Sequence, residues 1–195
     1  MKIGSSQQQR ALMVKHQNRL RYQIKVKLFY FTFVCQVEVG EYKLSDNEPG
    51  EQFRPVAEIR IHPEYNVSNG ANDIALIRVI PKIHLDGKYV SAVCMPDPLL
   101  NFTDYTGFAT GWGLDENGAI QEFLQEVQVS ILNECETELE EGQLCASADS
   151  GDACTHDEGG PLVIEEEDDH WYLAGLISQP SCGQNAESIY TDMTQ

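Results

Sequence analysis

From Asp152 to Leu162 the chain reads Asp-Ala-Cys-Thr-His-Asp-Glu-Gly-Gly-Pro-Leu. A plain polar turn would account for the residues from His156 to Glu158, but not for the cysteine before them or for Gly-Gly-Pro-Leu after them. A metal site would use His156 and Glu158 as ligands, but no further His, Cys, Asp or Glu at ligand spacing accompanies them. Neither interpretation explains the whole stretch.

The stretch resembles the active-site loop of the chymotrypsin/trypsin-like serine proteases, which reads Asp-Ser/Ala-Cys-Gln-Gly-Asp-Ser-Gly-Gly-Pro-Leu. The matching positions are Cys154, Asp157, Gly159, Gly160 and Pro161. In that family the serine is the nucleophile, and the serine and the glycine two residues before it donate backbone N–H groups to the oxyanion hole. Here Glu158 stands at the nucleophile position and His156 at the oxyanion-hole position. The resemblance implies the scaffold of a protease site without its chemistry.

Both replacements oppose catalysis for physical reasons. The carboxylate of Glu158 is already negative, so it would repel the oxyanion that acyl transfer must stabilise. His156 brings a Cβ to a position that favours glycine, whose backbone adopts conformations costly to other residues. Residues 1–36 also lack the Ala-Ala-His-Cys motif that supplies the family's general base. We therefore expect no functional catalytic residue.

The resemblance extends from Val37 to the end of the sequence and includes Ala-Thr-Gly-Trp-Gly at 109–113. It implies an all-β fold of two six-stranded antiparallel barrels. Residues 37–85 would form the rest of the first barrel, 86–100 the linker and 101–195 the second barrel, after an unmatched basic segment at 1–36. The first half of barrel one and the C-terminal helix would be missing, so we expect unpaired strand edges in both barrels.

Asp73 is placed by the resemblance where the family's acid orients the catalytic histidine. We expect it to be structural here, with the hydroxyl of Ser178 as the partner of its carboxylate. The specificity-pocket positions are Asp152, Ser178, Gln179, Pro180 and Ser188. Asp152 keeps the family's acid for Arg or Lys substrates, but Pro180 lacks the N–H that pairs with a substrate strand, and Ser188 replaces a glycine. The pocket is expected to bind basic side chains poorly.

The six cysteines allow many connectivities, and the sequence alone does not choose among them. The family resemblance implies two pairs, Cys135–Cys145 beside the cleft and Cys154–Cys182 between the active-site loop and the pocket wall. Cys94 resembles the cysteine that ties the protease domain to a prosegment. It is left either free or facing Cys35.

Charge is distributed unevenly along the chain. Seven of the 13 Lys and Arg residues lie in 1–36, which has no acidic residue. The rest of the chain therefore has six basic residues and all 31 acidic residues. This argues against nucleic acid and anionic membranes as partners and favours basic proteins or divalent cations, although acidic runs are usually solvated faces. The cysteines and the glycosylation sequons at Asn66 and Asn101 predict an oxidising, secreted location.

The acidic loop at 41–51 has the length and end residues of the trypsin calcium loop. By that resemblance, Glu41 and Glu51 would supply carboxylate oxygens, Lys43 and Asp46 backbone carbonyls, and Glu48 a direct or water-mediated contact. Calcium binds such hard oxygen ligands at flexible geometry. A solvated acidic turn is an equally open interpretation, and no other cofactor is implied.

The sequence is interpreted as a catalytically inactive homologue that acts as a binding or regulatory module. The pattern resembles arthropod clip-domain homologues of extracellular immune cascades, which implies protein partners such as proteases or zymogens. Two alternatives remain open: a serine endopeptidase with Arg/Lys preference, and a non-functional fragment of a longer protease-like protein.

Overall fold

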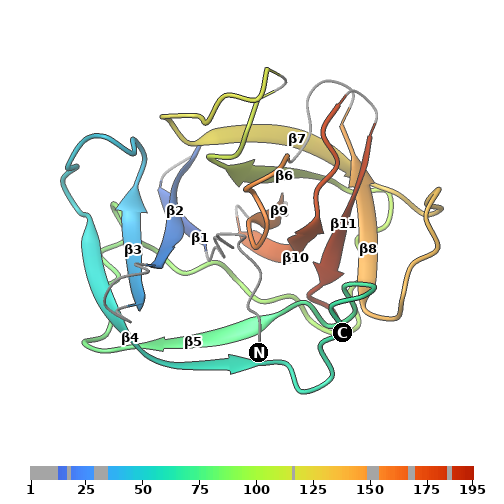
Figure 1. The fold of residues 1–195 in the computed structure, drawn as a ribbon, viewed down its shortest axis with the longest axis horizontal. Helices are drawn as coiled ribbons and strands as arrows, with labels where there is room; N and C mark the ends of the chain where they lie inside the picture. The colour runs from blue at the N-terminus through green and yellow to red at the C-terminus, as the bar shows by residue number, and fades with distance from the viewer. Residues whose placement is uncertain are drawn as a thin grey trace.

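The computed structural model describes residues 13–16, 19–28, 35–115, 117–148, 154–166, 170–183 and 186–195. These residues form strands, turns and extended connections (Figure 1). Within these ranges, no helix has the length and apolar character needed to cross a membrane. The all-β class predicted from the sequence is confirmed.

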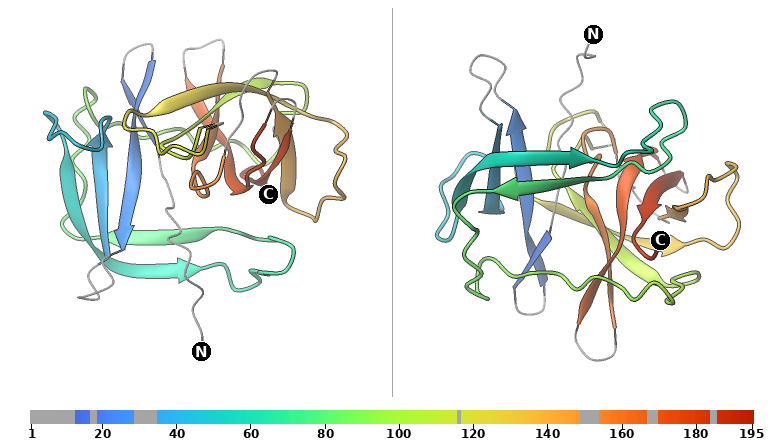
Figure 2. Two further views of the ribbon diagram at one scale, coloured as in Figure 1. Left: turned by 45° about the horizontal axis from the view of Figure 1, so that its top comes forward. Right: turned by 90° about the horizontal axis from the view of Figure 1, so that it is seen from below.

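Two antiparallel units make up the fold, seen from further directions in Figure 2. The first is a five-stranded sheet in chain order, composed of β1 (Met13–His16), β2 (Arg19–Leu28), β3 (Cys35–Glu41), β4 (Gln52–Ile61) and β5 (Ala75–Val79). The second is a closed barrel in the order β10-β11-β8-β7-β6-β9. Its strands are β6 (Thr106–Gly111), β7 (Gln125–Ile131), β8 (Gln143–Ser147), β9 (Pro161–Glu165), β10 (Trp171–Gln179) and β11 (Glu187–Asp192).

The barrel is closed by six strands that all lie between residues 106 and 192. The expectation of an unpaired edge in this barrel was therefore wrong. That expectation rested on a C-terminal helix, and a helix supplies no strand to the hydrogen-bonded ring. The first unit does have edges, because β1 and β5 each pair with one neighbour among the described strands.

The basic segment at the start of the chain contributes strands to the first sheet. β2 pairs with β3 in an antiparallel register that sets Val26 opposite Val37 and Lys25 opposite Glu38. β-branched residues recur in β2, β3 and β4, in keeping with their preference for pleated strands. The segment thus joins the sheet although it lacks the family's sequence motifs.

Each unit has its own core. The barrel encloses a cluster of buried side chains that consists of Phe102, Ala109, Val129, Ile131, Ala146, Ala148, Leu162, Ile164, Ala174, Ile177 and Tyr190. The first sheet buries Val37, Val39 and Val90, with partly buried neighbours from β4 and β5. The loop at 154–160 is hydrogen-bonded to the barrel at Ile177, whose N–H donates to the carbonyl of Gly160 and whose carbonyl accepts the N–H of Gly159, each over 2.7 Å.

The connection between the units runs along the barrel at Cys94. The N–H of Cys94 donates to the carbonyl of Trp171 over 2.9 Å, and its carbonyl accepts from the N–H of Leu173 over 3.0 Å. Its thiol is free and partly buried. The possible partner named from the sequence, the side chain of Cys35, lies outside the described part of the structure.

Candidate functional site

Two disulfides fix the loops around the candidate site. Cys154 and Cys182 are bonded, with Cα atoms 4.7 Å apart, and tie the 154–160 loop to the segment after β10. Cys135 and Cys145 are bonded with Cα atoms 6.2 Å apart. Both pairings implied by the family resemblance are confirmed.

Asp157 folds its carboxylate beneath the loop. Its Oδ1 accepts the N–H of Gly113 over 2.8 Å, and its Oδ2 accepts the N–H of Cys154 over 3.1 Å. Burial raises the pKa of Asp157, and the charge of Glu158 adds to the rise, while the two N–H bonds oppose it. The carboxylate thus orders the loop at an electrostatic cost.

Two glycines in the Ala-Thr-Gly-Trp-Gly signature make room for Asp157. A Cβ on Gly111 would lie 1.7 Å from the Asp157 Oδ1, and one on Gly113 would lie 2.4 Å from its Oδ2. Contacts this short require glycine at both positions. Sequence reasoning recognised the signature but missed this role, because the clash involves residues more than 40 positions apart.

His156 and Glu158 flank the partly buried Asp157. The backbone of His156 has a φ of 80°, the left-handed region that favours glycine, and its side chain is exposed. This agrees with the expectation that a Cβ at this position is costly. Glu158 is partly buried and offers a carboxylate where the family places a hydroxyl. A carboxylate there lacks the nucleophilic hydroxyl and adds negative charge.

Asp73 is anchored to the second barrel by two hydroxyls. The hydroxyl of Ser178 donates to the Asp73 Oδ2 over 3.0 Å, which confirms the partner predicted from the resemblance. The hydroxyl of Thr191 donates to the Asp73 backbone carbonyl over 3.0 Å. Sequence reasoning missed Thr191, which no quoted motif singled out. These contacts hold the β4–β5 connection against β10 and β11.

The pocket wall is tied together at Ser188. This residue is fully buried in β11, and its Oγ accepts the N–H of Ser181 over 2.9 Å, just after Pro180. The side chain therefore bridges the two segments that border the family's pocket. The side-chain amide of Gln179 donates to the carbonyl of Asn69 over 3.0 Å. The remaining pocket position, Asp152, lies outside the described residues.

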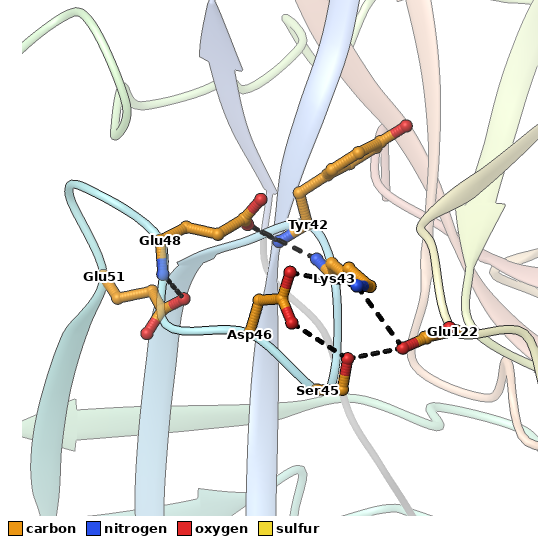
Figure 3. A network of polar contacts seen from close by, with 7 residues as sticks. All are labelled: Tyr42, Lys43, Ser45, Asp46, Glu48, Glu51 and Glu122. Atoms are coloured by element: carbon orange, nitrogen blue, oxygen red, sulfur yellow. Dashed lines mark hydrogen bonds and ion pairs between the residues drawn. The ribbon is translucent and has the colours of Figure 1, made fainter.

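The acidic loop brings three carboxylates together. Oxygens of Glu41, Glu48 and Glu51 all lie within 4.8 Å of one another. Glu48 also accepts the N–H of Tyr42 over 2.7 Å, and Glu51 accepts the N–H of Glu48 (Figure 3). The donor set consists of hard oxygens that converge, which fits a calcium ion chemically.

Lys43 directs its ammonium to one side of this loop. Its Nζ lies 2.9 Å from Asp46 and 3.7 Å from Glu122, and the hydrogen bond with Asp46 raises the pKa of Lys43 and lowers that of Asp46 (Figure 3). The ammonium thus pairs with carboxylates outside the converging trio. The Asp46 side chain is engaged in that pair, so only its carbonyl is open to the role predicted for it.

Both sequons lie on the surface. Asn66 and Asn101 are exposed. The Oδ1 of Asn101 accepts the N–H and the hydroxyl of Thr103, over 2.9 and 2.6 Å, and the Oδ1 of Asn66 accepts the N–H of Ser68 over 3.0 Å. An oligosaccharide on either asparagine would extend into solvent.

Known proteins resemble this chain over most of its length. Residues 33–195 match the Trypsin family. Mouse Ovochymase-2 is 34% identical over 80% of the chain, rat Transmembrane protease serine 11G is 34% identical over 72%, and rat Vitamin K-dependent protein C is 31% identical over 80%. The matches cover 30%, 37% and 38% of those relatives' own lengths. With this extent of match, and with a closed β-barrel, a second antiparallel sheet and the disulfide-tied 154–160 loop in place, the chain belongs to the trypsin family.

Proposed function

We propose that this chain is a catalytically inactive member of the trypsin family that serves as a binding or regulatory module. The observation that carries the proposal is Glu158 at the position of the nucleophile. The loop around it retains the disulfide to Cys182 and the buried carboxylate of Asp157, so the scaffold is intact while the reactive hydroxyl is replaced. The positive φ of His156 adds to the case, because that residue occupies the oxyanion-hole position.

The proposed setting is an extracellular proteolytic cascade, by resemblance to arthropod clip-domain homologues of immune cascades. Its partners would be proteins with basic surfaces, including proteases or zymogens, because the chain has a net charge of −18. The same charge disfavours nucleic acid and anionic membranes.

A secreted location is part of the proposal. The two disulfides support an oxidising compartment. One relative carries the word transmembrane in its name, so retention at a cell surface is the competing location. Glycosidase treatment of protein secreted by a eukaryotic host would lower its mass in two steps if Asn66 and Asn101 both carry glycans, and Asn66→Gln or Asn101→Gln would remove one step each.

Activity assays test the central claim. Loss of the nucleophile in such a site lowers the rate by a factor on the order of 10⁶, so neither labelling by a fluorophosphonate probe nor cleavage of Arg and Lys esters is expected. Glu158→Ser should remain inactive, because the sequence lacks the motif that supplies the base. Labelling of the wild type that persists in Glu158→Ala would reveal another nucleophile and overturn the proposal.

Binding of benzamidine examines the pocket separately. The contact between Ser188 and Ser181 and the proline at 180 predict negligible affinity for this analogue of a basic side chain. Calorimetry should detect no binding in the micromolar range. Micromolar affinity would mean that Asp152 still works as a specificity acid, and would favour the alternative of an Arg/Lys endopeptidase fold with an open pocket.

A further inference from the structure

The loop at 66–72, between β4 and β5 of the open sheet, contacts the closed barrel. Its Asn69 carbonyl accepts two hydrogen bonds from glutamine side chains of the barrel. The Nε2 of Gln143, from β8, donates over 3.1 Å, and the Nε2 of Gln179, at the end of β10, donates over 3.0 Å. In Figure 1 this β4–β5 connection lies beside the ends of β8 and β11. Two side chains from separate strands thus converge on one backbone oxygen of the first unit.

Gly70 brings the loop into close contact with β10. Its φ is 72°, and its N–H donates to the carbonyl of Asn66 over 2.9 Å. A Cβ at this position would lie 2.7 Å from the Nε2 of Gln179 and 3.1 Å from the Oγ of Ser178. The backbone of Gly70 therefore lies close to the hydroxyl that holds the carboxylate of Asp73. Any larger residue would displace Gln179 or open the loop.

We infer that the 66–72 loop is an intramolecular latch over the end of β10. The loop touches Ser178 and Gln179, which belong to the segment at 178–180 that matches the wall on which trypsin-family proteins lay a substrate strand. Gln143 and Gln179 hold the latch through the Asn69 carbonyl, and Gly70 covers the pair formed by Asp73 and Ser178. An extended peptide must displace the loop before it reaches this wall. The inference concerns the access of a peptide to residues 178–180 and not the chemistry at Glu158, so it does not depend on the loss of catalysis.

Hydrogen exchange tests whether the two glutamines hold the loop. In Gln143→Ala or Gln179→Ala, the amides of Asn66, Gly70 and Ala71 should exchange about fivefold faster, and in the double variant more than about tenfold faster. Gln125→Ala is the matched control, because its Nε2 donates to the carbonyl of Phe123 over 2.8 Å, away from the loop. The control should leave the loop amides unchanged.

Labelling of carboxyl groups with a carbodiimide tests whether the loop covers the end of β10 and Asp73. In the double variant, Asp73 should be modified several-fold faster than in the wild type, while exposed Glu64 reacts equally in both. Gly70→Ala should have the same effect, because its Cβ meets Gln179 with both glutamines retained. This variant serves if the double variant fails to fold, as judged by circular dichroism.

Each of the two experiments has a result that would contradict the latch. Loop amides that exchange at the wild-type rate in folded variants would show that the glutamines hold nothing and would overturn the latch. Faster exchange with unchanged labelling of Asp73 would show that the loop does not cover the end of β10, and would also overturn the latch. Neither result bears on the activity assays, so failure of the latch and failure of the proposed function are distinguishable.

Discussion

The closed barrel and the open five-stranded sheet are both antiparallel, but they bury their side chains to different degrees. In the barrel, four of the five side chains of β9 and most of those of β10 are buried. In the sheet, none of the ten side chains of β4 is fully buried, and they alternate between partly buried and exposed over most of the strand. Ile59 and Ile61, at the far end of β4, are 48% and 57% exposed.

The difference follows from closure. A closed ring of strands encloses one face completely, and side chains from opposite strands meet in its interior. An open sheet encloses a face only where other segments cover it, as the segment with Val90 covers Val37 and Val39. Stability from burial should therefore be concentrated in the barrel, which also carries both described disulfides and the candidate site.

The largest expected effect separates the two units directly. Leu162 in β9 is fully buried in the barrel core, so Leu162→Ala should lower the free energy of unfolding by about 3 kcal/mol through lost burial and a cavity. Leu76 in β5 is 70% exposed, and Leu76→Ala should change it by less than about 0.5 kcal/mol. Urea unfolding measures both. Equal losses would contradict the unequal distribution of stability.

Calcium is expected to stabilise the protein by binding to the acidic loop, which joins β3 to β4 in the open sheet. A site filled at 100 times its dissociation constant would raise the free energy of unfolding by about 2.7 kcal/mol. Melting curves in millimolar calcium and in chelator measure the shift. Glu51→Gln should abolish it and Glu64→Gln, in an exposed turn outside the loop, should not. An unchanged curve for the wild type would identify the loop as a solvated acidic turn.

The smallest expected effect concerns Asp157 and its pH dependence. Burial raises the pKa of Asp157 above its ordinary value of 3.8. At a pH between 3.8 and this raised pKa, folded Asp157 keeps a proton that the unfolded chain has lost. The contribution of this group to stability therefore falls as pH rises through that window. Asp157→Asn removes the titration, at a cost of about 1–3 kcal/mol, because the amide nitrogen faces a backbone N–H and one hydrogen bond is lost.

Urea unfolding of the wild type and Asp157→Asn from about pH 3 to about pH 7 isolates this group from the other acids. The stability of the wild type relative to the variant should decrease as pH rises. Asp86 and Asp115 have lowered pKa values because they accept backbone N–H bonds, and their opposite effect cancels in the difference. A difference that grows with pH would mean that the N–H bonds outweigh burial at Asp157.

The sequence by itself determined the features that local motifs encode. The family resemblance carried by these motifs implied both disulfides, and its match at Asp73 led to the hydrogen bond with Ser178. The replacement at Glu158 is chemical, so it is visible without coordinates. These predictions succeeded because the residue type at a position within a known motif restricts its neighbours and its chemistry.

Only the tertiary structure decided the features that depend on distant backbone positions. Closure of the barrel requires pairings such as that of β6 with β9, which composition does not reveal. The direction of the Lys43 ammonium follows from the position of Glu122, nearly 80 residues away. The meeting of Gln143 and Gln179 at Asn69 spans 74 and 110 residues. A rotatable side chain takes the partner that the fold brings within hydrogen-bonding distance, and sequence spacing does not report that distance.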